Sequence, residues 1–370
     1  MTEILLTIFF ISVLLFFLGS GIWVALSMIG VSAIGMMLFT SRPVGDAMAT
    51  TIWGTSSSWT LTALPLFVWM GEILFRTKLS ENLFKGLSPW MQKLPGGLIH
   101  VNVVGCALFA AISGSSAATV ATVGKMSIPE LRKRNYPEKI LLGSLAGSGT
   151  LGLLIPPSII LIIYGVAVQE SIAKLFIAGI IPGIMIALIF MSYVIIWSLI
   201  NKKSMPKIIE EYSFFEKIKR SKQLLPVIIL ILAVIGSIYT GIATATEAAS
   251  LGVVGALILS YFQKSLTLKT FKSSLLGATK TSCMIAFILA GSTFLSLAMG
   301  FTGLPRNLAL WIQNMELSPY VLIFVLMIFY IILGMFLDGI SAVVLTMAII
   351  EPMIRQAGFD MIWFGIFLVI

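Results

Sequence analysis

Two interruptions in apolar sequence between Gly105 and Ser158 carry the residue types that can bind an ion. They are Ser113-Gly114-Ser115-Ser116, and Gly147-Ser148-Gly149-Thr150 running on to Pro156-Pro157. In hydrocarbon an unpaired backbone N–H or carbonyl costs several kcal/mol, so broken helix is tolerated only inside protein or beside a wet cavity. Paired breaks free carbonyl oxygens and aim half-helix ends at an ion or an anion, which predicts a transport site.

The side chains at these breaks suit a hard cation. Sodium prefers several oxygen ligands, and serine and threonine hydroxyls together with freed carbonyls supply them, while glycine permits close backbone approach. An alternative interpretation is that the small residues only let helices pack closely. The two breaks occur together with a proline pair, and this favours a binding site over packing alone.

Composition predicts the class of protein in which this site lies. The chain has 370 residues, of which 58% are hydrophobic and 11% charged, with a mean hydropathy of +1.06. A soluble domain carries about 25% charged residues. The prediction is therefore an all-α polytopic membrane protein. The net charge of +9 comes from basic residues in short loops, which is the positive-inside pattern and indicates no nucleic-acid partner.

Other chemistry is not indicated. Cys106 and Cys283 lie in apolar runs and are interpreted as small core residues, and His100 borders a span and is interpreted as an interfacial residue. The sequence has no G-x-x-x-x-G-K-[ST] motif and no nucleophile–base pair, so an enzyme is not predicted. Energy for uphill transport would come from an ion gradient or a partner.

The order of apolar segments predicts spans, a re-entrant hairpin and a broken helix. Both halves of the hairpin are shorter than the about 20 residues that a span needs. The acidic Met1-Thr2-Glu3 does not resemble a signal peptide, so the first span is expected to stay in the protein. The expected segments are spans at 4–20, 22–40, 171–200, 223–240 and 242–262, an interfacial segment at 44–61, an apolar segment at 62–76, an amphipathic segment along the membrane surface at 77–96, a hairpin at 98–127 with its tip at Ser113–Ser116, and a broken helix at 140–168.

One loop fixes the predicted orientation. Residues 201–222 contain seven basic and three acidic residues, which indicates the cytoplasmic side. Even numbers of spans separate this loop from the basic loops at 125–139 and 264–272, so all three lie on one side. Glu247 follows a turn and is interpreted as the start of a surface helix rather than as a buried functional carboxylate.

The second half looks like a degenerate copy of the first. Asp338-Gly339-Ile340-Ser341 follows the first serine break at a separation of 225 positions. Asp338 is the one acid deep in this second hairpin, and sodium binding, proton binding and helix capping explain it about equally well. Glu351-Pro352 with Arg355 is predicted to form a cytoplasmic turn. The partner of Pro156 would fall beyond Ile370, so we expect this chain to be a partial copy at its C-terminal end.

The motifs AISGSSAATVATVG, IPE and LAGSGTLGLLIPPS resemble the large membrane subunit (M, or DctM-like) of TRAP transporters, the tripartite ATP-independent periplasmic carriers. The resemblance implies sodium-coupled uptake of an organic acid, such as sialic acid or a C4-dicarboxylate, across the bacterial inner membrane. It also implies a small membrane Q subunit, a periplasmic binding P subunit, and an elevator mechanism. Alternatives are a stand-alone sodium/dicarboxylate-type anion symporter, an intramembrane enzyme and an inert scaffold subunit.

With that resemblance, the chain is predicted to divide into scaffold (1–60 and 171–262) and two transport repeats (61–168 and 270–370), with the ligand between the hairpin tips and the broken helices. The residues predicted to bind sodium are Ser113, Gly114, Ser116, Gly149, Ile155, Pro156, Asp338 and Gly339. Those predicted to contact the substrate are Ser115, Ser116, Thr150, Pro156, Asp338 and Ser341.

Overall fold

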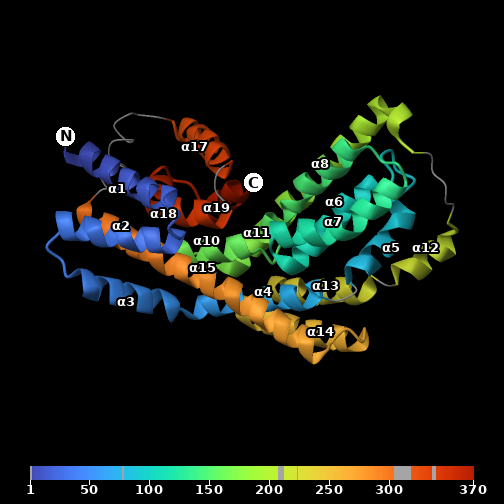
Figure 1. The fold of residues 1–370 in the computed structure, drawn as a ribbon, viewed down its shortest axis with the longest axis horizontal. Coiled ribbons are helices and arrows are strands. Elements are labelled where there is room, and N and C mark those ends of the chain that lie inside the picture. The colour runs from blue at the N-terminus through green and yellow to red at the C-terminus, as the bar shows by residue number, and fades with distance from the viewer. Residues whose placement is uncertain (1, 77–78, 207–211, 223, 304–317, 336–338) are drawn as a thin grey trace. The chain divides into compact units, whose positions relative to one another are not determined.

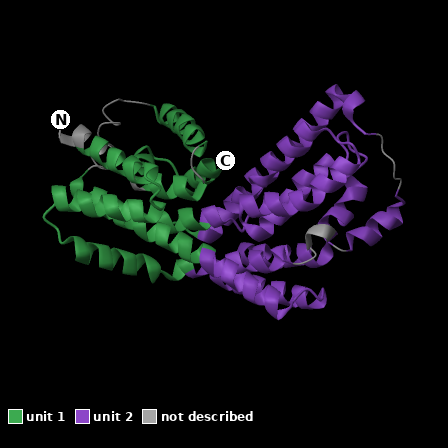
Figure 2. Cartoon of the chain, in the orientation of Figure 1, with its two compact units in different colours: residues 1–61, 162–171, 281–370 green, residues 62–161, 172–280 purple. Residues whose placement is uncertain are grey.

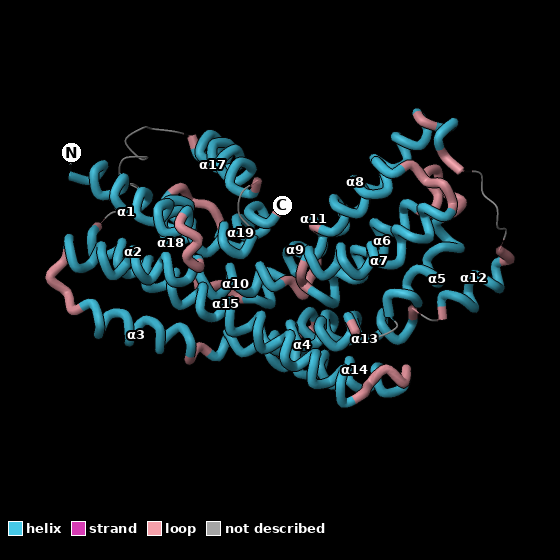
Figure 3. The backbone as a smooth tube through the Cα atoms, viewed as in Figure 1, coloured by secondary structure: helices cyan, strands magenta, loops and turns pink. Residues whose placement is uncertain are grey.

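The computed structural model describes residues 2–76, 79–206, 212–222, 224–303, 318–335 and 339–370, and all regular elements in these ranges are helical (Figures 1 and 3). This confirms the predicted all-α class. The helices of the first half are α1 Thr2–Gly19, α2 Val24–Phe39, α3 Val44–Ser56, η1 Trp59–Thr62, α4 Ala63–Phe75, α5 Leu79–Met91, α6 Ile99–Ser113, α7 Ser116–Lys133, α8 Glu138–Gly149, α9 Leu151–Leu154 and α10 Ile159–Ala167. Those of the second half are α11 Ile172–Ile200, η2 Lys202–Ser204, α12 Phe214–Ser221, α13 Leu225–Tyr239, α14 Ala245–Phe262, α15 Leu268–Thr302, α17 Pro319–Gly334, α18 Gly339–Gln356 and α19 Met361–Val369.

The chain forms two compact units, coloured separately in Figure 2. Unit 1 contains residues 1–61, 162–171 and 281–370, and unit 2 contains residues 62–161 and 172–280. These units group the chain differently from the predicted scaffold and transport repeats, because each unit includes segments of both kinds. The functional division of the chain stays a prediction.

Several helices are long and apolar enough to cross a bilayer. By length and composition the described residues provide three such helices, α11, α14 and α15, or as many as seven spans if each pair of helices bent at a short break counts as one. The predicted spans at 171–200 and 242–262 correspond to α11 and α14. The chain is therefore a multi-pass membrane protein.

The hairpin and the broken helix form where the sequence predicts them. Helices α6 and α7 meet at Gly114 and Ser115, and α7 continues six residues beyond the predicted end at 127. Between α9 and α10 the backbone leaves the helix over residues 155–158, which include Pro156-Pro157. Proline has no N–H to donate and its ring clashes with the preceding turn, so a proline pair ends the helix here.

Three landmarks of the first hairpin recur in the second at a constant separation of 223 residues. They are a proline, an arginine and a residue with positive φ: Pro129 and Pro352, Arg132 and Arg355, Asn135 and Gly358. This register aligns Gly339 with Ser116. The predicted separation of 225 is therefore wrong by two positions. The predicted turn at Glu351-Pro352 is also wrong, since both residues lie within α18 as Pro129 lies within α7.

Unit 1 is held by tight helix contacts and by long-range hydrogen bonds. A Cβ placed on Gly291 of α15 would lie 2.8 Å from the carbonyl oxygen of Ala25 on α2, so these helices approach as closely as backbones allow. The Ser292 hydroxyl donates to the Val344 carbonyl of α18 at 2.6 Å. The buried Tyr164 hydroxyl donates to the Met361 carbonyl at 2.6 Å, which ties the end of α10 to the start of α19.

A capping box begins α14 and confirms the interpretation of Glu247 as a helix start. The Thr244 hydroxyl accepts the Glu247 N–H at 3.3 Å, and Glu247 in turn accepts the Thr244 N–H at 2.8 Å. Glu247 is exposed. The acidic side chain thus satisfies the helix N-terminus rather than a transported ion.

Thr244→Ala is expected to destabilise unit 2. Loss of an N-cap hydroxyl costs about 1 kcal/mol, and thermal unfolding of the detergent-solubilised chain should show the melting temperature fall. Ser250→Ala is the matched control, because the exposed Ser250 hydroxyl bonds only within its own helix, to the Thr246 carbonyl. Equal effects of the two substitutions would contradict a capping role.

Candidate functional site

The hairpin tip is built by a left-handed residue followed by a helix cap. Gly114 has φ +59° and ends α6, with its N–H donating to the Ala110 carbonyl at 3.1 Å. Ser115 then caps α7, and its hydroxyl accepts the Ala118 N–H at 3.4 Å. Glycine adopts this left-handed conformation without the steric cost of a Cβ. The tip therefore reverses the chain within two residues inside the protein.

This tip packs directly against the proline break. The Gly114 carbonyl accepts the Ile159 N–H at 3.4 Å, and a Cβ on Gly114 would lie 2.7 Å from the Pro157 carbonyl oxygen. On the other side, a Cβ on Gly152 of α9 would lie 3.0 Å from the carbonyl of Ser115. The structure thus brings together the two breaks that the sequence pattern singled out, backbone against backbone.

Hydroxyl and carbonyl oxygens converge at the tip. The Ser113 and Thr119 hydroxyls are 2.8 Å apart, and both side chains are buried. The Thr119 hydroxyl donates to the Ser115 carbonyl at 2.7 Å, and the Ser113 hydroxyl reaches the same carbonyl at 3.3 Å. Thr119 is absent from the predicted site residues. It stands one helical turn after Ser115, a spacing that would have identified it.

The other predicted site residues of the first half differ in their burial and in their distance from this tip. Ser116 is half-buried in the first turn of α7, and a Cβ on Gly149 would be 3.7 Å from its carbonyl oxygen. Pro156 is buried within the break, and Ile155 contacts Gly183 of α11. Thr150, between α8 and α9, is exposed, and its hydroxyl donates to the Gly147 carbonyl of α8 at 2.7 Å, so the structure does not bring it to the tip.

The predicted residues of the second half lie in unit 1. Gly339 is the first residue of α18, and Ser341 is buried in its first turn. Asp338 lies outside the described residues. In the register of the repeat it takes the sequence position of Ser115.

The structure shows the surroundings of three residues named in the sequence analysis. His100 is fully buried within the protein: the turn before α6 folds over it, and its Nε2 lies 2.8 Å from the Pro95 carbonyl oxygen. Its predicted interfacial depth stays a prediction. Gly96, with φ +102°, makes room for that turn beside the imidazole. Cys283 is exposed on α15 rather than in the core, whereas Cys106 is buried as predicted.

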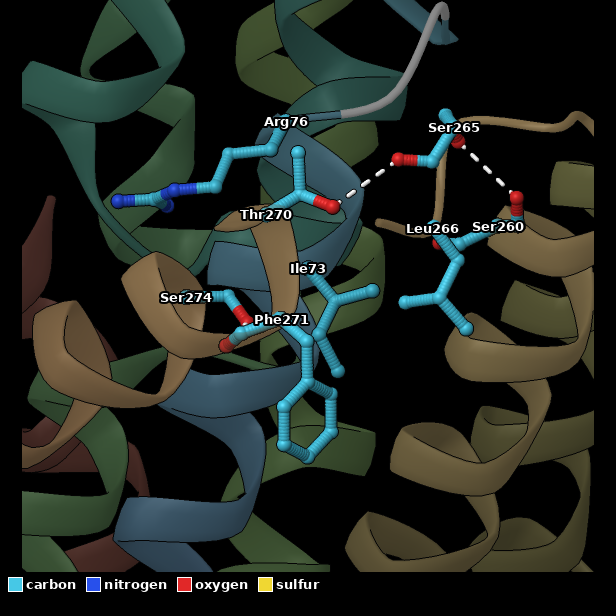
Figure 4. Close-up of a pocket in the computed structure, with 8 residues that line it drawn as sticks. All are labelled: Ile73, Arg76, Ser260, Ser265, Leu266, Thr270, Phe271 and Ser274. Atoms are coloured by element: carbon cyan, nitrogen blue, oxygen red, sulfur yellow. Dashed lines mark hydrogen bonds between the residues drawn. The ribbon is translucent and has the colours of Figure 1, made fainter. Parts of the chain in front are cut away.

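A small pocket elsewhere in unit 2 does not add a ligand site. It has a volume of about 10 Å³, close to the limit for one ordered water. The guanidinium of Arg76, one of its lining residues, pairs with Glu72 and extends away from Ser265 and Leu266 (Figure 4). In the part of the chain that the structure describes, no three His, Cys, Asp or Glu side chains come together as a metal site. Hydroxyls and backbone carbonyls are thus the oxygen donors gathered at the tip.

An all-helical multi-pass fold with a buried hairpin tip set against a broken helix is typical of membrane transporters. The chain matches the family model described as "Tripartite ATP-independent periplasmic transporter, DctM component" over residues 9–370. It belongs to this family, the large permease subunits of TRAP transporters, and the predicted resemblance is confirmed.

Three relatives illustrate the range of the family. The chain is 32% identical over 340 residues to the C4-dicarboxylate TRAP transporter large permease protein DctM of Pseudomonas aeruginosa, covering 91% of this chain and 78% of the relative. It is 30% identical to the sialic acid TRAP transporter large permease protein SiaM of Vibrio cholerae, covering 94% and 81%. It is 29% identical to the isethionate TRAP transporter permease protein DctMQ of Oleidesulfovibrio alaskensis, covering 96% and 55%. These relatives are transporter permease subunits and not enzymes.

Proposed function

We propose that this large permease subunit couples sodium to the uptake of an organic acid. The observation that carries the proposal is the cluster of Ser113, Ser115 and Thr119 oxygens at a tip whose backbone contacts the proline break. A sodium ion takes its ligands from such oxygens. All three donors belong to the hairpin, and the backbone of its tip contacts the proline break. An ion bound at the tip would favour the conformation in which this contact forms, and a gradient can thereby drive a conformational cycle.

The names of the relatives support this substrate class. C4-dicarboxylates, sialic acid and isethionate, named for three of them, are all small organic anions. The anionic group would meet half-helix N-termini and hydroxyls at the breaks, which act without a fixed positive charge. The start of α7 at the tip is one such N-terminus.

The proposed partners are a small membrane Q subunit and a periplasmic binding protein, with the complex in the bacterial inner membrane and an elevator motion of the hairpin-bearing segments. The name of one relative, the permease protein DctMQ, combines M and Q, which supports an association of the two subunits. Substrate choice would then rest largely on the binding protein.

Uptake by proteoliposomes tests the proposal. The chain with its Q subunit is reconstituted, an inward sodium gradient is imposed, and accumulation of radiolabelled C4-dicarboxylate, sialic acid and isethionate is measured with and without binding protein. We expect uptake of one of these anions to need both sodium and binding protein, and an equal potassium gradient to give none. Uptake with potassium would overturn sodium coupling. Sodium-driven uptake without binding protein would instead indicate a stand-alone symporter.

A further inference from the structure

Helix α12 of unit 2 presents an apolar face that the described part of the chain leaves largely exposed. Over its eight residues the helical period of 100° per residue gathers Phe214, Phe215 and Ile218 within one third of the circumference. These side chains are 68%, 79% and 41% exposed. The predicted cytoplasmic loop therefore contains an amphipathic helix, which sequence analysis did not identify.

The remainder of α12 and its C-cap are basic. Four cationic residues accompany one acidic residue, Glu216, and Glu216 is engaged in the capping box with the Ser213 N–H at 3.1 Å. On the same helical period Lys217 and Lys219 flank the apolar face on its two sides, Arg220 lies on the opposite face, and the C-cap Lys222 follows on the apolar side. Lys219, Arg220 and Lys222 are exposed. An apolar stripe edged by lysine and arginine is the pattern of a helix that lies in a membrane interface.

The position of α12 in the chain sets its depth. It lies between the 29-residue apolar helix α11, which ends at Ile200, and the apolar α13, which begins at Leu225. Only three residues separate α12 from α13. A segment so placed lies at the level where spans enter and leave the bilayer.

A tryptophan from α5 extends the apolar face of α12. The Trp90 indole N–H donates to the Ser221 hydroxyl at 2.7 Å, the Phe214 ring packs edge-on against Trp90 with ring centroids 6.3 Å apart, and the Lys217 ammonium lies 5.4 Å from the indole ring. Trp90 is itself 39% exposed. Tryptophan is favoured at the headgroup level of membranes because its ring is apolar and its N–H is polar.

We propose that α12 and Trp90 form a binding surface for anionic phospholipids on the cytoplasmic face of the membrane. Phe214, Phe215 and Ile218 would enter the headgroup–acyl boundary, and the flanking cations would bind the lipid phosphates. The cations of α12 complement the phosphate charges of anionic lipids, and the short connection to α13 keeps α12 near the membrane surface. Both features favour a lipid surface over a soluble protein as the partner. Because α5 leads into the hairpin helix α6 within eight residues, lipid bound here would hold the base of the hairpin.

The test reads lipid contact directly and does not depend on transport. In the full chain carrying Cys283→Ala, Phe215→Cys is labelled with an environment-sensitive fluorophore; Cys106 is buried and stays in place. The protein is reconstituted in phosphatidylcholine vesicles with or without phosphatidylglycerol, and quenching by headgroup-linked quenchers is measured. We expect quenching to be about threefold stronger with phosphatidylglycerol and to weaken in high salt.

Two charge variants distinguish lipid binding by the cations of α12 from a general effect of the positive charge of the protein. Lys219→Gln/Arg220→Gln/Lys222→Gln is expected to abolish the phosphatidylglycerol dependence. Lys264→Gln/Lys269→Gln/Lys272→Gln, which removes three exposed cations from the α14–α15 region, is expected to retain it. Equal quenching in both lipids, or an equal effect of the two variants, would overturn the proposal. Quenching of the label that falls as the protein-to-lipid ratio rises, and that does not depend on the lipid composition, would also overturn the proposal. It would indicate that a second copy of the chain covers α12.

Discussion

Replacing Gly114 by alanine is expected to reduce sodium-driven uptake to below about a tenth of the original rate. The new Cβ would lie 2.7 Å from the Pro157 carbonyl oxygen and 3.2 Å from the Ile159 nitrogen. The left-handed backbone adds about 1–2 kcal/mol for a non-glycine residue, and overpacking adds about 1–3 kcal/mol. The hairpin tip must therefore separate from the proline break, which removes the proposed ion site.

Gly143→Ala is the matched control for this substitution. Gly143 also lies in an interrupted segment, on α8, but a Cβ there would meet no heavy atom within 4 Å. Alanine is the better helix former by about 1 kcal/mol, so uptake and melting temperature should be unchanged or slightly raised. Normal uptake by Gly114→Ala, measured at equal reconstituted protein, would show that contact between the two breaks is dispensable.

Removing either of the paired hydroxyls at the tip should raise the sodium concentration for half-maximal uptake by about tenfold or more. Ser113→Ala and Thr119→Val each delete one oxygen of a pair 2.8 Å apart while keeping the local volume close to the original. A hydrogen-bonding group that meets a charge contributes about 1.5–3 kcal/mol, and about 1.4 kcal/mol corresponds to a tenfold change. Thr119→Ser keeps the hydroxyl and should retain most of the sodium affinity.

Initial uptake rates across a sodium titration measure this effect. Ser192→Ala serves as the control, since the exposed Ser192 hydroxyl bonds to the Leu188 carbonyl of its own helix and lies on α11. An unchanged sodium dependence in both Ser113→Ala and Thr119→Val would place the coupling ion elsewhere. A lower maximal rate with unchanged sodium dependence would assign these hydroxyls to the packing of the tip.

The hairpin and the broken helix were predictable because their signals are local. A Ser-Gly-Ser-Ser run and a proline pair disfavour helix locally, and here they interrupt it through the left-handed conformation of Gly114 and the missing N–H groups of Pro156 and Pro157. The apolar spans were equally plain, since α11 and α14 match the predicted ranges closely. Such features depend on residue type and hydropathy and need no information from distant parts of the chain.

Errors arose where long-range packing decides. The burial of His100 did not follow from its position beside a span, because it depends on the turn through Pro95 and Gly96. The register of the repeat was two residues out, because the glycines were aligned to each other although Gly339 corresponds to the helix-starting Ser116. Helix α12 was missed because eight residues give too short an apolar period to stand out within a charged loop.

By itself the sequence determined that this protein is helical, that it crosses the membrane repeatedly, and where its helices break, because backbone groups in hydrocarbon must be satisfied locally. Only the tertiary structure decided that the tip at Gly114 meets the carbonyl of Pro157 and that Thr119 joins Ser113 there. Those contacts depend on how α6, α7 and α9 pack. Packing is set by the shapes of many side chains at once, so no single motif encodes it.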